Sequence, residues 1–184
     1  MTRDEIESVF WAATIMCLGL DPADESDSVS KRVRKSWAKA DIGASDWGRE
    51  ENVVFLHILP RDEETSRTVN NVSYKYDKTL DKHQEIVDFY DSWQITWVCY
   101  GPDAYEDAQT IRVGILRDSI RTFLQRNKIG IQPHITRPQY FPEQEDNGEW
   151  WERYDLTAYA YENVRRVYES DSIARGPNII IFNQ

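Results

Sequence analysis

Apolar and polar residues alternate between Trp93 and Tyr100, and this stretch organises the interpretation of the whole chain. One set of alternate positions holds Trp93, Ile95, Trp97 and Cys99, and the other holds Gln94, Thr96, Val98 and Tyr100. A period of two with aromatic and β-branched residues predicts a strand with one well-buried face. Gly101 and Pro102 end it, because proline has no N–H to donate to a ladder and glycine permits a sharp reversal.

The residues that follow predict a long helix. Asp103 is placed to cap it, with Glu106 three residues further on as in a capping box. An apolar stripe then drifts round the helix from Ala104 to Arg126, and Asn127 is a suitable C-cap. We therefore expect one helix over residues 104–126, joined to the strand by a rigid corner.

A second helix is predicted at the start of the chain. Thr2 is a good N-cap and Glu5 completes its capping box, whereas Gly19 and Pro22 mark the end. Apolar residues recur between them at helical spacing, at Ile6, Val9, Phe10, Ala13, Met16, Cys17 and Leu20. The stretch 21–30 is acidic and serine-rich, and we interpret it as a solvated loop.

Most of the remaining chain has strand patterns. The run 53–59 predicts a central strand that Pro60 ends, and 68–76 predicts a second strand of the same sheet. Residues 77–83 are a polar excursion, after which 85–89 lead into the strand at 93–100. The basic run 31–37 is interpreted as a half-buried strand with Val33 inside, phosphate binding being the alternative. Residues 129–135 suit an edge strand, because Pro133 interrupts them.

These elements predict an α+β fold, an antiparallel sheet flanked by two main helices. The length of 184 residues suggests one domain over 1–184, with a core over about 1–168 and a C-terminal extension over 169–184. The first residues do not resemble a signal peptide, and no apolar run is long enough to cross a bilayer. Cys17 and Cys99 lie in apolar patterns and are expected to be buried free thiols.

The net charge is −10, from 22 Lys and Arg against 32 Asp and Glu. This balance argues against a protein that grips the nucleic-acid backbone. The excess of acidic residues can serve solubility. It can also form a surface that repels DNA, which would let DNA pass close by without binding.

Residue types that carry chemistry are sparse. The three histidines, His57, His83 and His134, have no His or Cys partner at metal-ligand spacing. The chain has no GxSxG, P-loop or GxGxxG motif. We therefore expect no catalytic site, no cofactor and no metal, and not an enzyme.

Two stretches near the C-terminus are candidates for a contact between subunits. Both faces of the predicted strand 150–161 carry apolar groups, and Gly176-Pro177-Asn178 introduces an apolar tetrad. The tetrad needs cover, so it either adds to its own sheet or docks on a neighbour. The hypothesised interface residues are Trp151, Tyr159, Tyr161, Ile179, Ile180, Ile181 and Phe182.

The order of these elements resembles the neck or tail terminator proteins of tailed bacteriophages and their prophage relatives. The resemblance covers roughly residues 32–168. It rests on the N-terminal helix, Arg32 to Trp37, the loop with Gly43 and Trp47, Glu51 to Phe55, the corner Tyr100 to Ala104, and the aromatic strand Trp151 to Tyr161. The corner is its most specific piece and is structural, so the resemblance carries no active site. The chain departs from the pattern in its extended C-terminus and in the excursion 77–83.

The resemblance implies a virion protein of the neck and tail, assembled in the host cytoplasm, whose copies form a ring, usually a hexamer. Such a ring caps the tail tube and joins it to the head, while DNA passes through an acidic lumen without specific binding. The implied partners are copies of the chain itself, the tail tube, the sheath and head-completion proteins, with no membrane.

Other readings stay open from the sequence. A head-completion stopper and a tail-tube subunit belong to the same class of small ring-forming proteins. A regulatory module whose acidic surface mimics DNA belongs to another class, and so does an enzyme with an unrecognised site.

Overall fold

The computed structural model describes residues 1–24, 26–35, 48, 50–79, 82–144 and 150–171. The helices are α1 (Arg3–Cys17), α2 (Asp27–Arg32), α3 (Ala104–Gly114) and α4 (Asp118–Arg126), with a short 3-10 helix η1 (Glu64–Arg67). The strands are β1 (Val33–Lys35), β2 (Val53–Pro60), β3 (Val69–Asp77), β4 (Lys82–Tyr100), β5 (Ile129–Ile131), β6 (Gln139–Tyr140), β7 (Glu143–Gln144), β8 (Trp150–Trp151) and β9 (Arg153–Asp171). The fold is therefore mixed α+β, as the sequence predicted.

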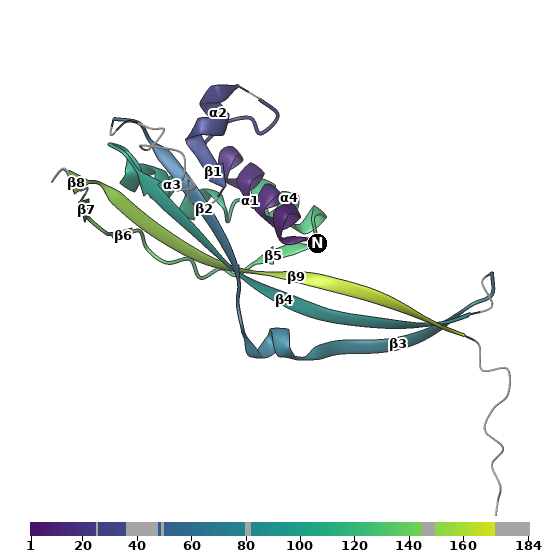
Figure 1. The fold of residues 1–184 in the computed structure, drawn as a ribbon. Coiled ribbons are helices and arrows are strands. Elements are labelled where there is room, and N and C mark those ends of the chain that lie inside the picture. Colours follow the sequence, from purple (N-terminus) through teal and green to yellow (C-terminus); the bar gives the residue numbers. More distant parts are fainter. Residues whose placement is uncertain (25, 36–47, 49, 80–81, 145–149, 172–184) are drawn as a thin grey trace, which may run out of the picture.

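Two long strands form the spine of the molecule. Strands β4 and β9 are each 19 residues long and pair antiparallel without a register shift, from Lys82 opposite Asp171 to Tyr100 opposite Arg153. Along the other edge of β4 the partner changes, because β2 pairs with Trp93 to Tyr100 whereas β3 pairs with Lys82 to Phe89. The two halves of the spine therefore lie in two different structural settings, which have different neighbouring strands (Figure 1).

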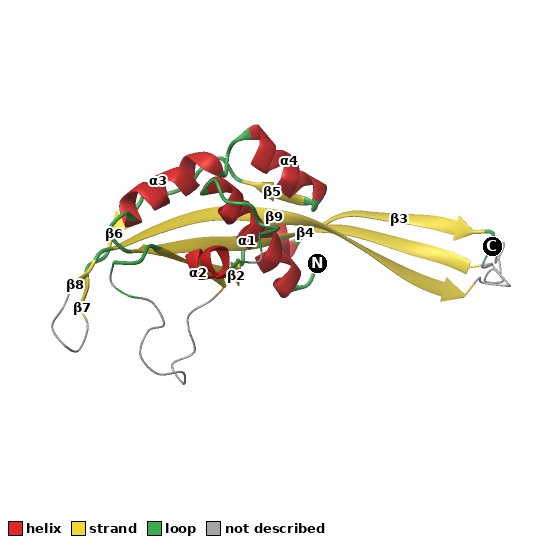
Figure 2. Ribbon diagram, turned by 90° about the horizontal axis from the view of Figure 1, so that it is seen from above, coloured by secondary structure: helices red, strands yellow, loops and turns green. Residues whose placement is uncertain are grey.

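One setting is the body, in which helices cover one face of the sheet. The strand order there is β1-β2-β4-β9-β5, and α1, α3 and α4 lie on one side of it (Figures 1 and 2). Trp97 of β4 is fully buried, and its indole Nε1–H donates to Thr14 Oγ1 of α1 at 2.8 Å. Phe10, Ile95 and Leu156 are also fully buried in this core. Burial of this apolar surface against the helices supplies most of the stability of the fold.

The other setting is the arm, which we define as residues 69–77, 82–90 and 163–171. It is a three-stranded ribbon of β3, β4 and β9 that extends away from the body, with no described helix on either face (Figures 1 and 2). Strand β3 follows the turn that contains η1 and hydrogen-bonds to β4 alone.

The corner after β4 is tight because its glycine lies against the chain before β2. Gly101 has φ +108°, and a Cβ there would lie 2.5 Å from the Glu51 carbonyl oxygen. The predicted side-chain cap by Asp103 is wrong. Its carboxylate accepts instead from Asn52 Nδ2 at 2.8 Å, while Asn52 Oδ1 accepts the Asp103 N–H at 2.8 Å. The corner therefore joins α3 to the start of β2.

The single long helix expected over 104–126 is also wrong. Helix α3 ends at Gly114, and Arg117 has extended torsion angles of φ −64° and ψ 145° before α4 begins. Gly114 fits against α1, where a Cβ would lie 3.0 Å from Cys17 Cβ. The break redirects the chain so that α1 contacts both α3 and α4, which explains why the apolar stripe drifts in the sequence.

Three other expectations need correction. The sheet is not wholly antiparallel, because β1 pairs with β2 in parallel. The stretch 21–30 is not all loop, since α2 begins at Asp27. The strand predicted over 150–161 is two strands, β8 and β9, and β9 continues as far as Asp171. In contrast, the capping box of Thr2 and Glu5 is confirmed.

Candidate assembly surface

The three predicted interface residues that the structure describes, Trp151, Tyr159 and Tyr161, do not form one patch. Trp151 lies in β8 with only 8% of its surface exposed. It packs edge to face on Tyr100, at 6.3 Å between ring centroids, in a small second cluster that also contains Val53, Phe55 and Val98. Strand alternation places this cluster on the sheet face opposite the helices. Trp151 is therefore already covered within one copy of the chain.

Tyr159 lies where the body meets the arm. The guanidinium of Arg61, just after β2, stacks on its ring at 3.9 Å from the centroid. Arg61 also pairs with Glu63 at 3.2 Å, and Glu63 accepts from Ser92 Oγ at 2.9 Å. We call Arg61, Glu63, Ser92, Tyr159 and Tyr161 the junction cluster. Its cation–π contact and hydrogen bonds hold the end of β2 and the start of η1 against the spine.

Tyr161 is the exposed member of the junction cluster. Its side chain is 42% exposed and meets Tyr90 edge to face at 5.7 Å. The ring also covers Gly130 of β5, where a Cβ would lie 2.3 Å from Tyr161 Cζ. Glycine is therefore required at 130 for the tyrosine to lie flat over β5. The other predicted interface residues, Ile179 to Phe182, lie outside the described residues.

The arm has one apolar and one polar face. Side chains opposite each other in paired strands share a face, so the register assigns every arm residue. The face that continues the helix-covered side, the apolar arm face, carries Val72, Tyr74, Tyr76, Val87, Phe89, Val164 and Tyr168, together with His83, Glu85 and Arg166. In the body this side is buried under helices. In the arm Tyr74 is 73% exposed and Tyr168 is 50% exposed.

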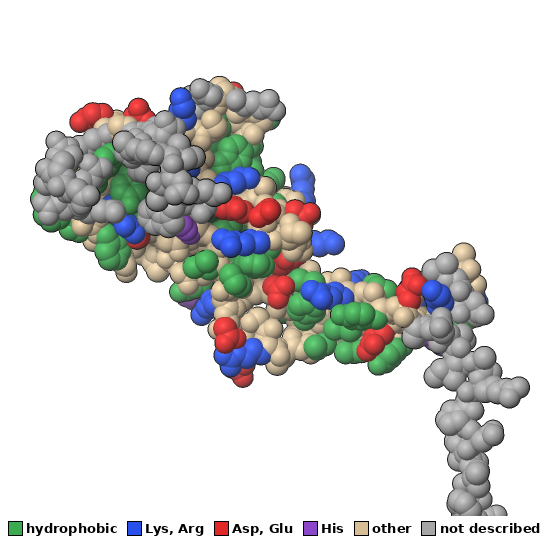
Figure 3. Space-filling model, in the orientation of Figure 1, with side chains coloured by type: hydrophobic (Ala, Val, Ile, Leu, Met, Phe, Trp, Pro, Cys, Tyr) green, Lys and Arg blue, Asp and Glu red, His purple; other side chains and the backbone are tan. Residues whose placement is uncertain are grey.

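Weak polar and ring contacts join side chains of the apolar arm face to one another but leave the face exposed to water. The Tyr74 hydroxyl lies 3.4 Å from Glu85 Oε1, and the ring of Tyr76 lies 5.1 Å from that of His83. The Arg166 guanidinium lies 5.6 Å from the centre of Phe89. Apolar side chains are visible at the arm surface in Figure 3. An exposed apolar patch of this kind marks a binding surface.

The polar arm face is held by charge pairs. Arg165 binds Asp88 through two hydrogen bonds of 2.7 and 3.1 Å, and Lys82 lies 3.1 Å from Glu169. The hydrogen bonds from Arg165, with a weaker one from Asn71, lower the pKa of Asp88. This face is therefore satisfied by its own side chains in water, unlike the apolar face.

Both long edges of the arm are open in the described part of the chain. The outer edge of β3 has no strand partner there, and β9 has none on its outer side beyond Glu162, where β5 ends its pairing. Open edges accept a further strand from another chain. The arm thus offers a face and two edges for assembly.

The thiols and histidines do not form a chemical centre. Cys17 and Cys99 are buried free thiols, as expected; burial raises the pKa of Cys17 to about 12 and raises that of Cys99 as well. Burial, followed by the charges of Arg153 and Arg3, lowers the pKa of His57. Within the described ranges no cluster of His, Cys, Asp and Glu could hold a metal ion.

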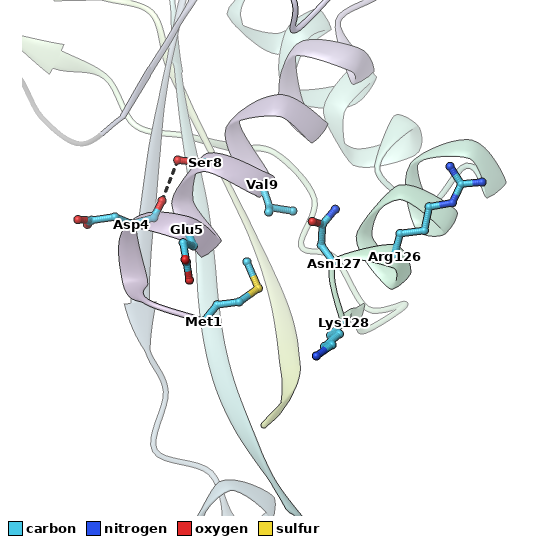
Figure 4. A pocket seen from close by; sticks show the side chains of 8 residues that line it. All are labelled: Met1, Asp4, Glu5, Ser8, Val9, Arg126, Asn127 and Lys128. Carbon is cyan, nitrogen blue, oxygen red and sulfur yellow. Dashed lines mark hydrogen bonds between the residues drawn. The ribbon is translucent and has the colours of Figure 1, made fainter. Parts of the chain in front are cut away.

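A surface hollow lies between the start of α1 and the end of α4 (Figure 4). Acidic Asp4 and Glu5 stand on one side and basic Arg126 and Lys128 on the other, with Met1 between them. The hydroxyl of Ser8 donates to the Asp4 carbonyl at 2.8 Å and accepts from Lys35 at 2.8 Å. The described lining residues include no histidine or cysteine.

Comparison with known proteins decides the class. The model of the phage neck terminator protein family matches residues 5–184, which is nearly the whole chain. The chain belongs to this family. It is a structural component of the phage virion that acts at the neck with other head and tail proteins. A search of curated proteins finds no match to the chain. None of the helices in the described part of the chain has the length and apolar character to span a bilayer.

Sequence reasoning found the strands of this neck protein but missed the arm. The alternation of Val72, Tyr74 and Tyr76 predicted a second strand of the sheet, and the register shows that their partners are Val87, Glu85 and His83. The available signal was the scarcity of helical segments, since three short helices cannot cover two strands of 19 residues. Charges of both signs are intermingled on the face seen in Figure 3, so no single acidic wall stands out on that side.

Proposed function

We propose that copies of this chain stand side by side in a ring, with six copies in the complete assembly. The ring caps the finished tail tube and joins it to the head, and DNA passes through its lumen. The observation that carries the proposal is the arm of this family member. Half of its longest strand pair leaves the core and presents two edges that are open in the described part of the chain, each of which can accept a strand from another copy.

A ring needs a heterologous contact, in which one patch of a copy meets a different patch of the next. Tyr161 supports a place for this contact at the junction cluster, because it is exposed and held rigid by Tyr90 and Gly130. Rigid aromatic side chains lose little entropy on binding and are enriched in interfaces. Tyr159 lies two residues before Tyr161 in β9 and therefore on the same face of the sheet.

The charge of the chain supports passage of DNA without capture. A net charge of −10 gives few cations with which to neutralise phosphates. Without the release of counterions, DNA gains no affinity for the wall of the lumen. We place the excess acidic charge toward this lumen.

Light scattering after size-exclusion chromatography tests the ring, with the protein alone and with purified tail tubes. We expect a discrete oligomer that binds one end of the tube. A protein that stays monomeric and never binds tubes contradicts the proposal. Unlimited polymerisation would instead support a tail-tube subunit, the alternative within the same class.

A pair of variants tests the contact. Tyr161→Asp places a charge at the proposed interface and should shift the oligomer to folded monomers. Tyr105→Asp is the matched control, because Tyr105 on α3 has a similar exposure of 44% and lies far from the junction. Circular dichroism checks that both variants fold. If Tyr161→Asp leaves the oligomer intact, the contact lies elsewhere.

A further inference from the structure

The apolar arm face exposes large apolar side chains to water. No described residues form a second layer over its three strands, although a small sheet gains stability when its apolar face is packed against another layer. Val72, Tyr74 and Tyr168 are 45%, 73% and 50% exposed. A cover for this face would remove apolar area from water at about 25 cal/mol per Å².

The described chain ends beside this face. Strand β9 leaves the body, forms one edge of the arm and reaches Asp171 at the arm tip, opposite Lys82. Seven residues, 172–178, then precede the apolar tetrad Ile179 to Phe182. A link of this length spans at most about 24 Å when extended. Strand β3 has 9 residues and is therefore about 30 Å long.

We propose that Ile179 to Phe182 of the same chain lie across the outer half of the apolar arm face, over Val72, Tyr74 and Tyr168. An extended tetrad covers about 13 Å, which matches the distance from Tyr76 near the tip to Val72. Gly176 and Pro177 permit the reversal that this path needs. Of the two covers that the sequence leaves open for the tetrad, this assigns it to its own sheet and leaves the junction cluster to contact other copies.

Two physical reasons favour this occupant. A segment tethered by so short a link has an effective concentration in the millimolar range at the arm, far above that of a second chain in dilute solution. The tetrad has no charge, so it suits the apolar face and not the polar face, where Arg165 and Lys82 already bind Asp88 and Glu169. The proposal does not depend on the ring.

Disulfide trapping in the full-length chain tests the proposal. Tyr74→Cys is paired in turn with Ile180→Cys and Ile181→Cys, so that either orientation of an extended tail presents one thiol to the arm. Lys75→Cys is the matched control, since it is the next residue of β3, also exposed, but on the opposite face. The native thiols Cys17 and Cys99 are buried and form the same background in every variant.

We expect a disulfide within one chain that forms about tenfold faster from position 74 than from position 75, in line with a docked tether. Equal rates from the two faces would overturn the proposal, because the tail would then prefer neither. A disulfide that joins two chains would also overturn it and assign the tail to a neighbouring copy. Light scattering on the same samples measures the oligomeric state separately. The proposal of a ring and the proposal of a docked tail can therefore be refuted independently.

A second measurement keeps the test independent of cysteine chemistry. Ile180→Asp together with Phe182→Asp should undock the tail and raise the binding of an apolar dye, with the circular dichroism of the body unchanged. Asn183→Asp is the control for added charge. Unchanged dye binding in the double variant would show that the tail does not cover the arm.

Discussion

The body and the arm are built from the same two strands and differ in what lies on them. Strands β4 and β9 run through both regions with one continuous register. In the body, Trp97 and Ile95 of β4 are fully buried, whereas on the same side of the arm Tyr74 is 73% exposed. The pairing of β4 with β9 is therefore the same in the two regions, and burial of apolar side chains is not. Pairing of β4 with β9 therefore sets the shape of the spine, and packing of the helices determines which half of it is buried in a core.

The same contrast holds for charge. In the body, Arg32 of α2 binds Asp107 of α3 through two contacts of 2.6 Å, with little of either side chain exposed. In the arm, Arg165 binds Asp88 with its own side chain 66% exposed. Burial raises the pKa of Asp107 in spite of its arginine, whereas Arg165 lowers that of Asp88. Each ion pair thus reports whether its region excludes water.

The largest expected effect breaks the core of the body. Trp97→Ala removes a fully buried ring and its hydrogen bond to Thr14, and should lower the free energy of unfolding by about 3–5 kcal/mol. Val167→Ala truncates an apolar side chain of the polar arm face that is 50% exposed, and should change it by less than about 0.5 kcal/mol. Urea titrations of both variants measure this. Equal losses would show that the arm is packed like the body.

The second effect compares the two ion pairs. Arg32→Met leaves the Asp107 carboxylate buried without its partner, at a cost of about 2–3 kcal/mol at pH 7 after allowance for partial exposure. A carboxyl group whose pKa is raised by folding binds protons more tightly when folded. The free energy of unfolding therefore falls as pH rises from the pKa that Asp107 has in the unfolded chain toward its higher pKa in the folded protein. The loss in Arg32→Met should consequently be smaller at pH 4 than at pH 7.

Arg165→Met is the control for this comparison, because its partner Asp88 stays in water. Its loss at pH 7 should not be resolved by urea titration. A loss in Arg32→Met that does not change with pH would show that Asp107 is not the group responsible.

The smallest effect sharpens the border between the regions. Gly130→Ala places a methyl group against the ring of Tyr161 and should cost about 1–3 kcal/mol by overpacking. When Gly130→Ala is made in the Tyr161→Ala variant, it should lower the free energy of unfolding much less, because the tyrosine ring is absent. A double-mutant cycle by thermal unfolding measures the coupling. Additive losses would mean that Tyr161 does not rest on β5.

Much of the fold followed from short-range pattern. The capping box at Thr2, the strand that ends at Gly101 and the burial of Cys99 were all predicted correctly. Where the prediction failed, distant residues competed with local signals. Asn52 displaced the expected cap of Asp103, and contact of Gly114 with Cys17 accompanies the break between α3 and α4. Of the predicted interface residues, Tyr161 is exposed and Trp151 is buried within one copy, and a role for either in a subunit contact stays a prediction.

The sequence by itself determined the N-terminal helix, most of the strands and the class of protein to which the chain belongs. These properties follow from periods of two and 3.6 residues and from local turn chemistry, which act over a few neighbours. Only the tertiary structure decided that one half of the spine is a core and the other an arm. That depends on where α1, α3 and α4 pack, and so on contacts between residues that are far apart in the chain.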